Sequence, residues 1–193
     1  MKLVFATNNP NKLKEIQAAV PESMTILGLD AIDCHEDIPE EQDTIEGNSA
    51  QKVNYIKTHY GVDSFADDTG LLVDALNGAP GVYAARYAGP EKSSEANMTK
   101  LLAALKDQPN RKAHFKTVIS LRIDDKLHQF TGICEGEITR ERHGDKGFGY
   151  DPIFQPDGFE QTFAELSMGV KNDISHRGRA VKKLINFLKS VDI

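Results

Sequence analysis

In the first part of the chain, short apolar runs alternate with a segment of helical periodicity. Lys2–Ala6 and Met24–Leu29 are apolar and end at turn-forming residues, which is typical of buried strands. Between them, Leu13, Ile16 and Val20 recur at the spacing of one helix face. The pattern therefore predicts a strand, a helix and a second strand.

Farther along, the pattern predicts three more helices and a long hairpin. The helices are expected over about 45–60, from Ser93 or Ser94 onward, and over about 176–191. Residues 113–123 alternate apolar with polar, Asp124 and Asp125 form a turn, and 127–138 alternates again, which indicates an antiparallel pair. A brief strand at 64–67 is expected to end on acidic residues. The segments 77–90 and 144–151 are rich in glycine and proline, so they are expected to be loops.

This order of elements predicts an α/β fold with a mixed sheet, because strand–helix alternation comes first and a hairpin follows. The chain of 193 residues shows no repeats, and no Pro/Gly/Ser-rich linker is long enough to separate independent domains. We expect residues 1–193 to form a single domain with two lobes, the second built around the hairpin.

Composition narrows the possible partners. The formal net charge of -6 disfavours a general nucleic-acid binder, which needs a basic face. Cys34 and Cys134 fit no metal-ligand spacing and no disulfide framework, so they are expected to be buried thiols. No apolar run reaches the length of a signal peptide's core or of a membrane span. We expect no nucleic-acid partner, no membrane association and a cytoplasmic location.

Residues 7–12 form a candidate phosphate-binding segment, because they follow a strand and open a helix. Asn9 can cap that helix and Pro10 suits its first turn. Free N–H groups and the helix dipole attract phosphate at such a position, and Lys12 adds a cation. An ordinary capped helix start remains the alternative, since no Walker A motif is present.

Asp67 and Asp68 form a candidate metal site. Adjacent carboxylates repel each other unless a proton or a cation lies between them, and Mg²⁺ prefers oxygen ligands. Thr69 and Gly70 permit a tight turn close to a ligand. The alternative is a solvated acidic turn.

Two further segments have the residue types that bind nucleotides. In the segment 147–152, Phe148 can stack on a base and Asp151 can accept a hydrogen bond from a base N–H. Near the last helix start, Lys171, His176 and Arg177 can bind phosphate or a base carbonyl. Core aromatics and a capping histidine are the alternatives.

Taken in order, these motifs resemble the inosine triphosphate pyrophosphatase family over nearly the whole chain. The matching residues are Thr7, Asn9 and Lys12, the run Ala66-Asp67-Asp68-Thr69-Gly70, Gly-Ala-Pro-Gly at 78–81, Phe-Gly-Tyr-Asp-Pro at 148–152, and Ser-His-Arg at 175–177. Asn8 is a departure, since many relatives have glycine there.

The resemblance implies hydrolysis of ITP, dITP and XTP to the nucleoside monophosphate and pyrophosphate. It also implies a Mg²⁺ requirement, an elongated mixed α/β fold with the active cleft between two lobes, and a homodimer. Asp68 would be the proton acceptor and, with Glu40, a metal ligand. The implied substrate-binding residues are Thr7, Asn8, Asn9, Pro10, Asn11, Lys12, Thr69, Phe148, Gly149, Tyr150, Asp151, Lys171, His176 and Arg177.

Three alternatives remain open. A septum-inhibition type of nucleotide pyrophosphatase acts on canonical or modified pyrimidine triphosphates, but the Ser-His-Arg and Phe-Gly-Tyr-Asp motifs disfavour it. A nucleotide sensor without hydrolysis has no need of Asp67, Asp68 and Lys12 together. A nucleic-acid-binding protein is disfavoured by the charge.

Overall fold

The computed structural model describes residues 2–190, and its contacts divide the chain into two compact units. Of the described residues, unit 1 comprises 2–68, 117–132 and 176–190, and unit 2 comprises 69–116 and 133–175. Within residues 2–190, no helix is both long and apolar enough to cross a membrane.

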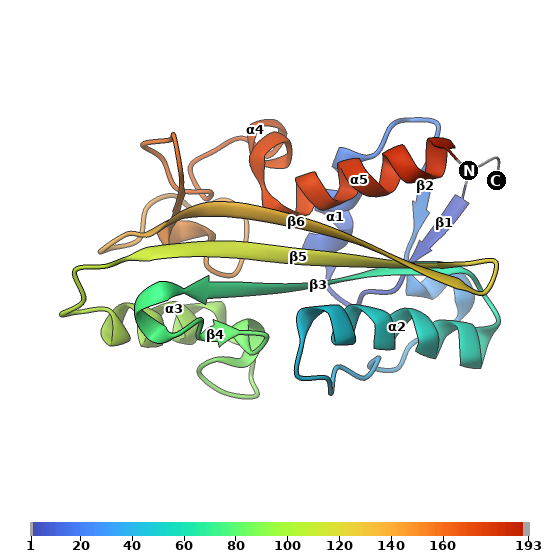
Figure 1. The fold of residues 1–193 in the computed structure, drawn as a ribbon, viewed down its shortest axis with the longest axis horizontal. Helices are drawn as coiled ribbons and strands as arrows, with labels where there is room; N and C mark the ends of the chain where they lie inside the picture. The colour runs from blue at the N-terminus through green and yellow to red at the C-terminus, as the bar shows by residue number, and fades with distance from the viewer. Residues whose placement is uncertain (1, 191–193) are drawn as a thin grey trace. The chain divides into compact units, whose positions relative to one another are not determined.

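Unit 1 is built on parallel strands with helices on both faces (Figure 1). Its elements are β1 (Lys2–Phe5), α1 (Pro10–Ala19), β2 (Thr25–Leu27), α2 (Ile45–Tyr60), the first part of β3 (Ser64–Val73), the adjoining parts of β5 (Lys112–Ile123) and β6 (Lys126–Ile138), and α5 (His176–Ser190). β1 lies between β2 and β3 and is parallel to both.

Unit 2 contains the remaining parts of β3, β5 and β6, and its other strand pairs are antiparallel. It adds β4 (Pro80–Gly81), α3 (Ser94–Ala104), β7 (Phe154–Pro156) and α4 (Met168–Ile174). Phe115, Phe154 and Phe163 meet at the centre of its core, with ring centroids of Phe115 and Phe154 4.6 Å apart. The predicted α/β class with a mixed sheet is confirmed.

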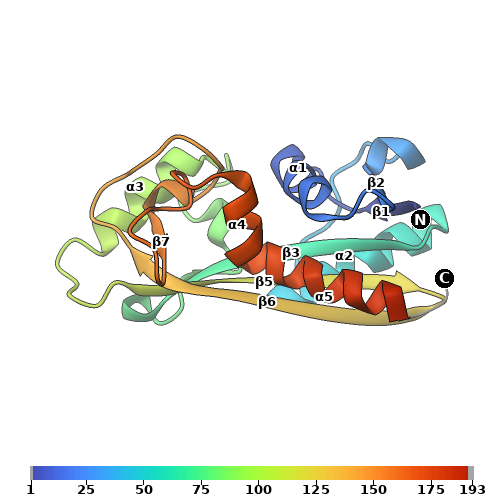
Figure 2. The same ribbon diagram turned by 90° about the horizontal axis from the view of Figure 1, so that it is seen from above.

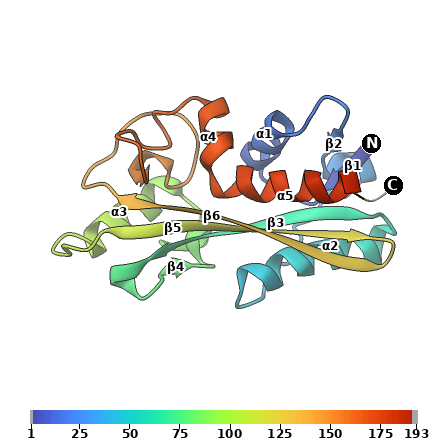
Figure 3. The same ribbon diagram turned by 45° about the horizontal axis from the view of Figure 1, so that its top comes forward.

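Alternation along β3 gives the two faces of the unit 1 sheet different helical partners. Phe65 stacks on Phe5 with centroids 4.6 Å apart and belongs to the apolar cluster formed with α1 and α5. The next residue, Ala66, belongs to the cluster formed with Val53 and Ile56 of α2. Figures 1 and 3 show α5 and α2 on opposite sides of the strands. Successive β3 side chains therefore point to different helices.

Most of the predicted elements are present, with identifiable caps. The Asn9 side chain caps α1, Pro10 occupies its first turn, and Ser93 caps α3. Both cysteines are buried and carry free thiols, as predicted. The predicted last helix matches α5, although its expected end at 191 lies outside the described residues.

Three local predictions are wrong. The strand expected at 64–67 does not end on its acids but continues to Val73, because both carboxylates find polar partners on the helices that cover the sheet. β4 lies within the segment 77–90, which was expected to be an irregular loop. α4 was missed because its seven residues are too few to show a helical period.

Gly132 lets α5 begin directly against β6 (Figure 2). A Cβ at this position would lie 2.0 Å from the His176 carbonyl oxygen and 2.6 Å from the Ala180 nitrogen. Both atoms belong to backbone, so the helix start would have to move. Gly132→Ala is therefore expected to lower the free energy of unfolding by about 1–3 kcal/mol, the usual cost of overpacking.

Urea unfolding measures this effect, with Gly169→Ala as the control. Gly169 lies in α4, and a Cβ there meets no atom within 4 Å. That variant should be neutral or slightly stabilising, because alanine favours helix. Equal stabilities of the two variants would contradict the close contact between α5 and β6.

Candidate functional site

Asp67 and Asp68 are adjacent in β3, yet they interact with different elements. The carboxylate of Asp67 is paired with Lys12 of α1 and Arg177 of α5, as expected on the face of Phe65. The carboxylate of Asp68 accepts a hydrogen bond from Asn48 of α2, on the face of Ala66. Their adjacency in sequence had suggested one shared cation site, but the two acids do not form one.

Asp67 is the centre of a buried ion network. Its side chain is fully buried, with Oδ1 3.0 Å from Lys12 Nζ and Oδ2 3.0 Å from Arg177 Nε. Arg177 Nη1 also lies 2.5 Å from Glu15 Oε2. Burial alone would raise the pKa of Asp67, but Lys12, Arg177 and Lys52 outweigh it and hold that pKa well below its usual range. Asp67 is ionised and structural.

Two helix starts supply this network. Lys12 and Glu15 are three residues apart in the first turns of α1, so they lie on one face. Arg177 is the second residue of α5, and His176 before it is also buried. Cationic side chains from both helix starts thus converge on one residue of β3, although the sequence separates Lys12 from Arg177 by nearly the whole chain.

Asp68 has the environment expected of a general base. Its side chain is buried, and Asn48 Nδ2 donates to its Oδ2 at 3.3 Å. Burial raises the pKa of Asp68; Lys52 and Lys12 oppose this, while the charges of Glu40 and Asp67 add to it. A carboxylate with a raised pKa holds a proton more readily and is closer to the strength that base catalysis at neutral pH requires.

Lys52 of α2 connects Glu40 to β3. Its Nζ lies 2.5 Å from Glu40 Oε1 and donates to the backbone oxygen of Asp67 at 2.7 Å. Burial would lower the pKa of Lys52, but the charges of Glu40, Asp68 and Asp67 raise it above its usual value. Lys52 therefore remains a cation and sets the position of Glu40.

The acidic loop that carries Glu40, residues 33–43, is also tied to α2. Asn48 Oδ1 accepts from the N–H of Gln42 at 2.8 Å, and Gln51 Oε1 accepts from the N–H of Glu41 at 2.9 Å. Gly47 permits this packing, because a Cβ there would lie 2.8 Å from Gln42 Cβ. Asn48 thus bonds both the loop and Asp68.

The donor set around Asp68 fits a hard divalent cation. Glu40 and Asp68 present carboxylate oxygens, and their mutual repulsion, which raises the pKa of Asp68, is what a cation relieves. Among the residues described, no three His, Cys, Asp or Glu side chains converge as a metal site. Two carboxylates suit Mg²⁺, which usually takes its remaining ligands from water and substrate phosphates.

In the segment 7–12, several polar groups are engaged within the protein. Asn9 Oδ1 accepts from the N–H groups of Asn11 and Lys12, and Thr7 Oγ1 accepts from the N–H of Asn9. The Asn8 side chain is directed to the acidic loop. Lys12 Nζ, whose side chain is 14% exposed, is the cationic group that this segment presents.

Unit 2 contains a second cluster, centred on Asp151. Its Oδ2 accepts from Lys171 Nζ at 2.6 Å and from the N–H of Phe148 at 2.8 Å. Lys171 Nζ also lies 5.3 Å from the centre of the half-buried Phe148 ring. The cluster therefore holds an aromatic face and a buried cation together, which suits stacking of a base.

Glycine shapes the loop that carries this cluster. Gly147 has φ +74, and a Cβ there would lie 2.0 Å from Asp151 Oδ2. Gly149 also has a positive φ. The Tyr150 hydroxyl donates to the backbone oxygen of Ala84 at 2.7 Å, and Tyr150 is a core residue. Thr69 is half-buried in β3, directly after Asp68.

Sequence reasoning missed Glu15, Asn48 and Lys52 as members of the polar clusters. Asn48 and Lys52 are four residues apart in α2, so they lie on the same helix face. That spacing, directly after the acidic loop, was a usable signal. No comparable signal existed for Glu15, whose partner is distant in sequence.

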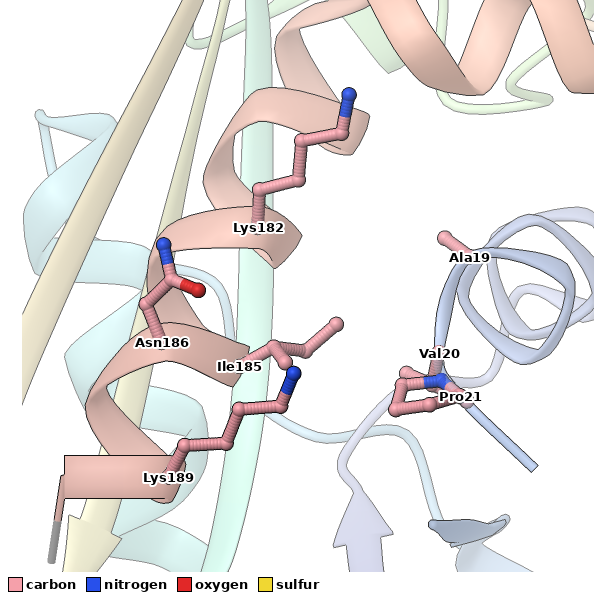
Figure 4. Close-up of a pocket in the computed structure, with 7 residues that line it drawn as sticks. All are labelled: Ala19, Val20, Pro21, Lys182, Ile185, Asn186 and Lys189. Carbon is pink, nitrogen blue, oxygen red and sulfur yellow. The ribbon is translucent and has the colours of Figure 1, made fainter. Parts of the chain in front are cut away.

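A hollow of about 450 Å³ lies at the far ends of α1 and α5 from the Asp67 network (Figure 4). It has two lysines and no acidic residue, histidine or cysteine, so it lacks groups for acid–base chemistry. Its lining residues are Ala19, Val20, Pro21, Lys182, Ile185, Asn186 and Lys189.

Known proteins resemble this chain over its full length. A dITP/XTP pyrophosphatase of Flavobacterium johnsoniae is 60% identical over 188 residues, covering 97% of this chain and 98% of the relative. That of Porphyromonas gingivalis is 52% identical over 188 residues, covering 97% of each.

Solved structures agree with the sequence comparison. The Ham1 protein of Staphylococcus aureus superposes with a TM-score of 0.88 at 39% identity, covering 98% of this chain and 99% of that one. A HAM1 protein of Coxiella burnetii gives 0.90 at 36% identity, covering 99% and 100%. Residues 3–187 match the family model of the Ham1 family. The chain therefore belongs to the Ham1 family.

Proposed function

We propose that this protein hydrolyses dITP, ITP and XTP to the nucleoside monophosphate and pyrophosphate, and so removes deaminated purines from the nucleotide pool. The observation that carries the proposal is the buried Asp68, with its raised pKa, beside Glu40 and the cations Lys12 and Lys52. The dITP/XTP pyrophosphatases that are up to 60% identical support the substrate class.

In this reaction, the anhydride bond between the α and β phosphorus atoms breaks and water supplies the new hydroxyl group. Asp68 orients that water and accepts its proton. Lys12 stabilises the negative charge of the phosphates. In unit 2, Phe148 stacks on the base, Lys171 adds positive charge, and Asp151 holds both residues in place.

We also propose Mg²⁺ as the metal, held by Glu40 and Asp68 with phosphate and water oxygens completing its coordination. When bound, the ion supplies charge neutralisation of the triphosphate and a lowered pKa of coordinated water. The further proposals are a homodimer, which light scattering would test, and a cytoplasmic location without nucleic-acid or membrane partners. The free thiols of Cys34 and Cys134 are consistent with a reducing compartment.

Pyrophosphate release from ITP, dITP, XTP, GTP, ATP and dTTP, with Mg²⁺ and with EDTA, tests the proposal. Fast Mg²⁺-dependent release from the first three substrates alone is expected. Release from dTTP instead would place the protein with pyrimidine-acting enzymes. Binding of ITP without release would identify a nucleotide sensor and remove Asp68 from a catalytic role.

Arg177→Lys is expected to lower the ITP-to-ATP ratio of kcat/KM. Arg177 or His176 donates to the 6-oxygen of the base in our proposal, and a donor facing the 6-amino group of adenine costs about 1–3 kcal/mol, a factor of roughly 5–150. Lysine is the useful substitution: its single nitrogen keeps a buried cation for Asp67 and Glu15, but it lacks the additional guanidinium nitrogen that would reach the base. An unchanged ratio in a folded variant would exclude Arg177 as the reader of the base.

A further inference from the structure

Asn8 links two loops of unit 1. Its Nδ2 donates to the backbone oxygen of Glu36 at 3.2 Å and to Asp37 Oδ1 at 3.1 Å. Asn8 belongs to the segment 7–12, which presents Lys12, whereas Glu36 and Asp37 belong to the acidic loop that continues to Glu40. One amide group thus connects the two segments that carry a candidate phosphate ligand and a candidate metal ligand.

The acidic loop also makes polar contacts with α2. Tyr60 and Tyr55 donate to Glu36 Oε1 at 2.5 and 3.2 Å. Beyond Asp37, the N–H of Glu41, the N–H of Gln42 and the Glu40 carboxylate are bonded to α2 side chains. These polar bonds join the loop to α2, and Cys34 and Ile38 pack into the apolar cluster on that face of the sheet. The Asn8 bonds add a polar tie between the loop and the segment that opens α1.

Asn8 differs from the polar residues beside it. The side chains of Thr7 and Asn9 bond to backbone N–H groups of their own segment and so shape the start of α1. The exposed Asn8 side chain reaches residues 28 and 29 positions away. A glycine at this position would have no side chain to make this tie.

We propose that Asn8 is a positioning residue that holds the acidic loop against the segment 7–12 and thereby keeps Glu40 in place relative to Lys12. The inference deepens the proposed hydrolysis and rests on it for its effect on rate. Its structural part, the coupling of the two loops, does not depend on that activity.

Hydrogen exchange tests the coupling without substrate or metal. Asn8→Ala should speed amide exchange in residues 34–44 about two- to tenfold, the range set by one net hydrogen bond. Asn186→Ala, an exposed asparagine of α5, is the matched control and should leave that segment unchanged. Unchanged exchange in the Asn8 variant would overturn the proposal even in an inactive protein.

Steady-state kinetics with ITP test the effect on function. Asn8→Ala should lower kcat by about two- to tenfold and raise the Mg²⁺ concentration needed for half-maximal rate. Asp37→Ala should reproduce part of this change, Asp37→Asn should retain the acceptor and the rate, and the double variant Asn8→Ala/Asp37→Ala should be less than additive. An increase in KM alone, with Asp37→Ala silent, would mean that Asn8 binds substrate directly and would overturn the positioning role.

The two proposals fail in distinguishable ways. If the wild-type protein releases no pyrophosphate from any triphosphate, the proposed function fails while the exchange result still decides the loop coupling. If the wild-type protein hydrolyses ITP and the Asn8 variant matches it in rate, Mg²⁺ dependence and exchange, the positioning role alone fails.

Discussion

Asp68→Asn is expected to lower kcat for ITP hydrolysis at least about 100-fold, the low end of the contribution of a general base. The amide keeps the shape of the side chain and can still accept a hydrogen bond from Asn48, so the local packing is preserved. It loses the ability to take a proton from water, and it loses the negative charge through which a metal would be held. The variant is therefore expected to fold normally but to lose its catalytic activity.

Fixed-time assays of pyrophosphate release measure this loss. Thermal unfolding checks that the variant is folded. The melting temperature of the Asp68 variant should not fall, because a neutral amide is less costly to bury than a carboxylate. Asp74→Asn, an exposed aspartate in unit 2, is the control and should retain wild-type turnover. Wild-type turnover in the Asp68 variant would remove this residue from the mechanism.

Asp67→Asn is expected to lower the free energy of unfolding by about 3–5 kcal/mol, the usual cost of removing one partner from a buried ion pair. Asp67 is fully buried and neutralises both Lys12 and Arg177, so its loss leaves the buried Arg177 and the half-buried Lys12 with less compensation. Activity should fall as well, since both helix starts lose their common anchor. The two variants at adjacent positions of β3 would thus lose activity for different reasons: Asp67→Asn through stability and Asp68→Asn through catalysis.

Urea unfolding of the Asp67 variant is best compared with that of Asp63→Asn. Asp63 pairs with Lys57 at 2.7 Å, but the two side chains are 33% and 29% exposed. A solvent-exposed pair of this kind is worth about 0–1 kcal/mol. If the two variants lost equal stability, the Asp67 network would be no more than a surface ion pair in energetic terms.

Acid should reduce the difference between wild type and the Asp67 variant. The folded-state pKa of Asp67 lies below that of the unfolded chain, for which the ordinary value is about 3.9. The unfolded state therefore binds more protons below that pH, and stability contributed by ionised Asp67 is complete above it. That contribution is lost as the pH falls through the folded-state pKa. Unfolding curves at neutral pH and at about pH 3 should show the two proteins converging.

Local rules predicted most of the secondary structure. Asn9, Pro10 and Ser93 mark helix starts through their own backbone chemistry, and the alternation over residues 113–138 marks β5 and β6. These signals depend only on neighbours in sequence, so they can be recognised without knowledge of the fold. β3 was cut short because two adjacent acids ordinarily end a buried strand, and their distant partners could not be seen.

The sequence named individual residues as candidates for the site, but it did not separate their roles. Asp68, Lys12 and Arg177 were named from the sequence, but Asp67 and Asp68 were taken as one cation site. Their separation follows from the two-residue period of a strand, which sends one carboxylate toward α1 and α5 and the other toward α2. Which helix covers which face is a property of the packed structure.

The sequence by itself determined the fold class, the helix caps, the hairpin and, through ordered motifs, the family to which the chain belongs. Tertiary structure alone decided which polar groups pair with one another: Glu15 with Arg177, Lys52 with Glu40, and Asn8 with the acidic loop. Elements and caps are set by contacts within a few residues. The ion-pair and hydrogen-bond partners lie from 12 to 162 positions apart in the sequence, and packing brings them together. Packing also excludes water from most of these groups, so that a buried charge without a partner would be costly.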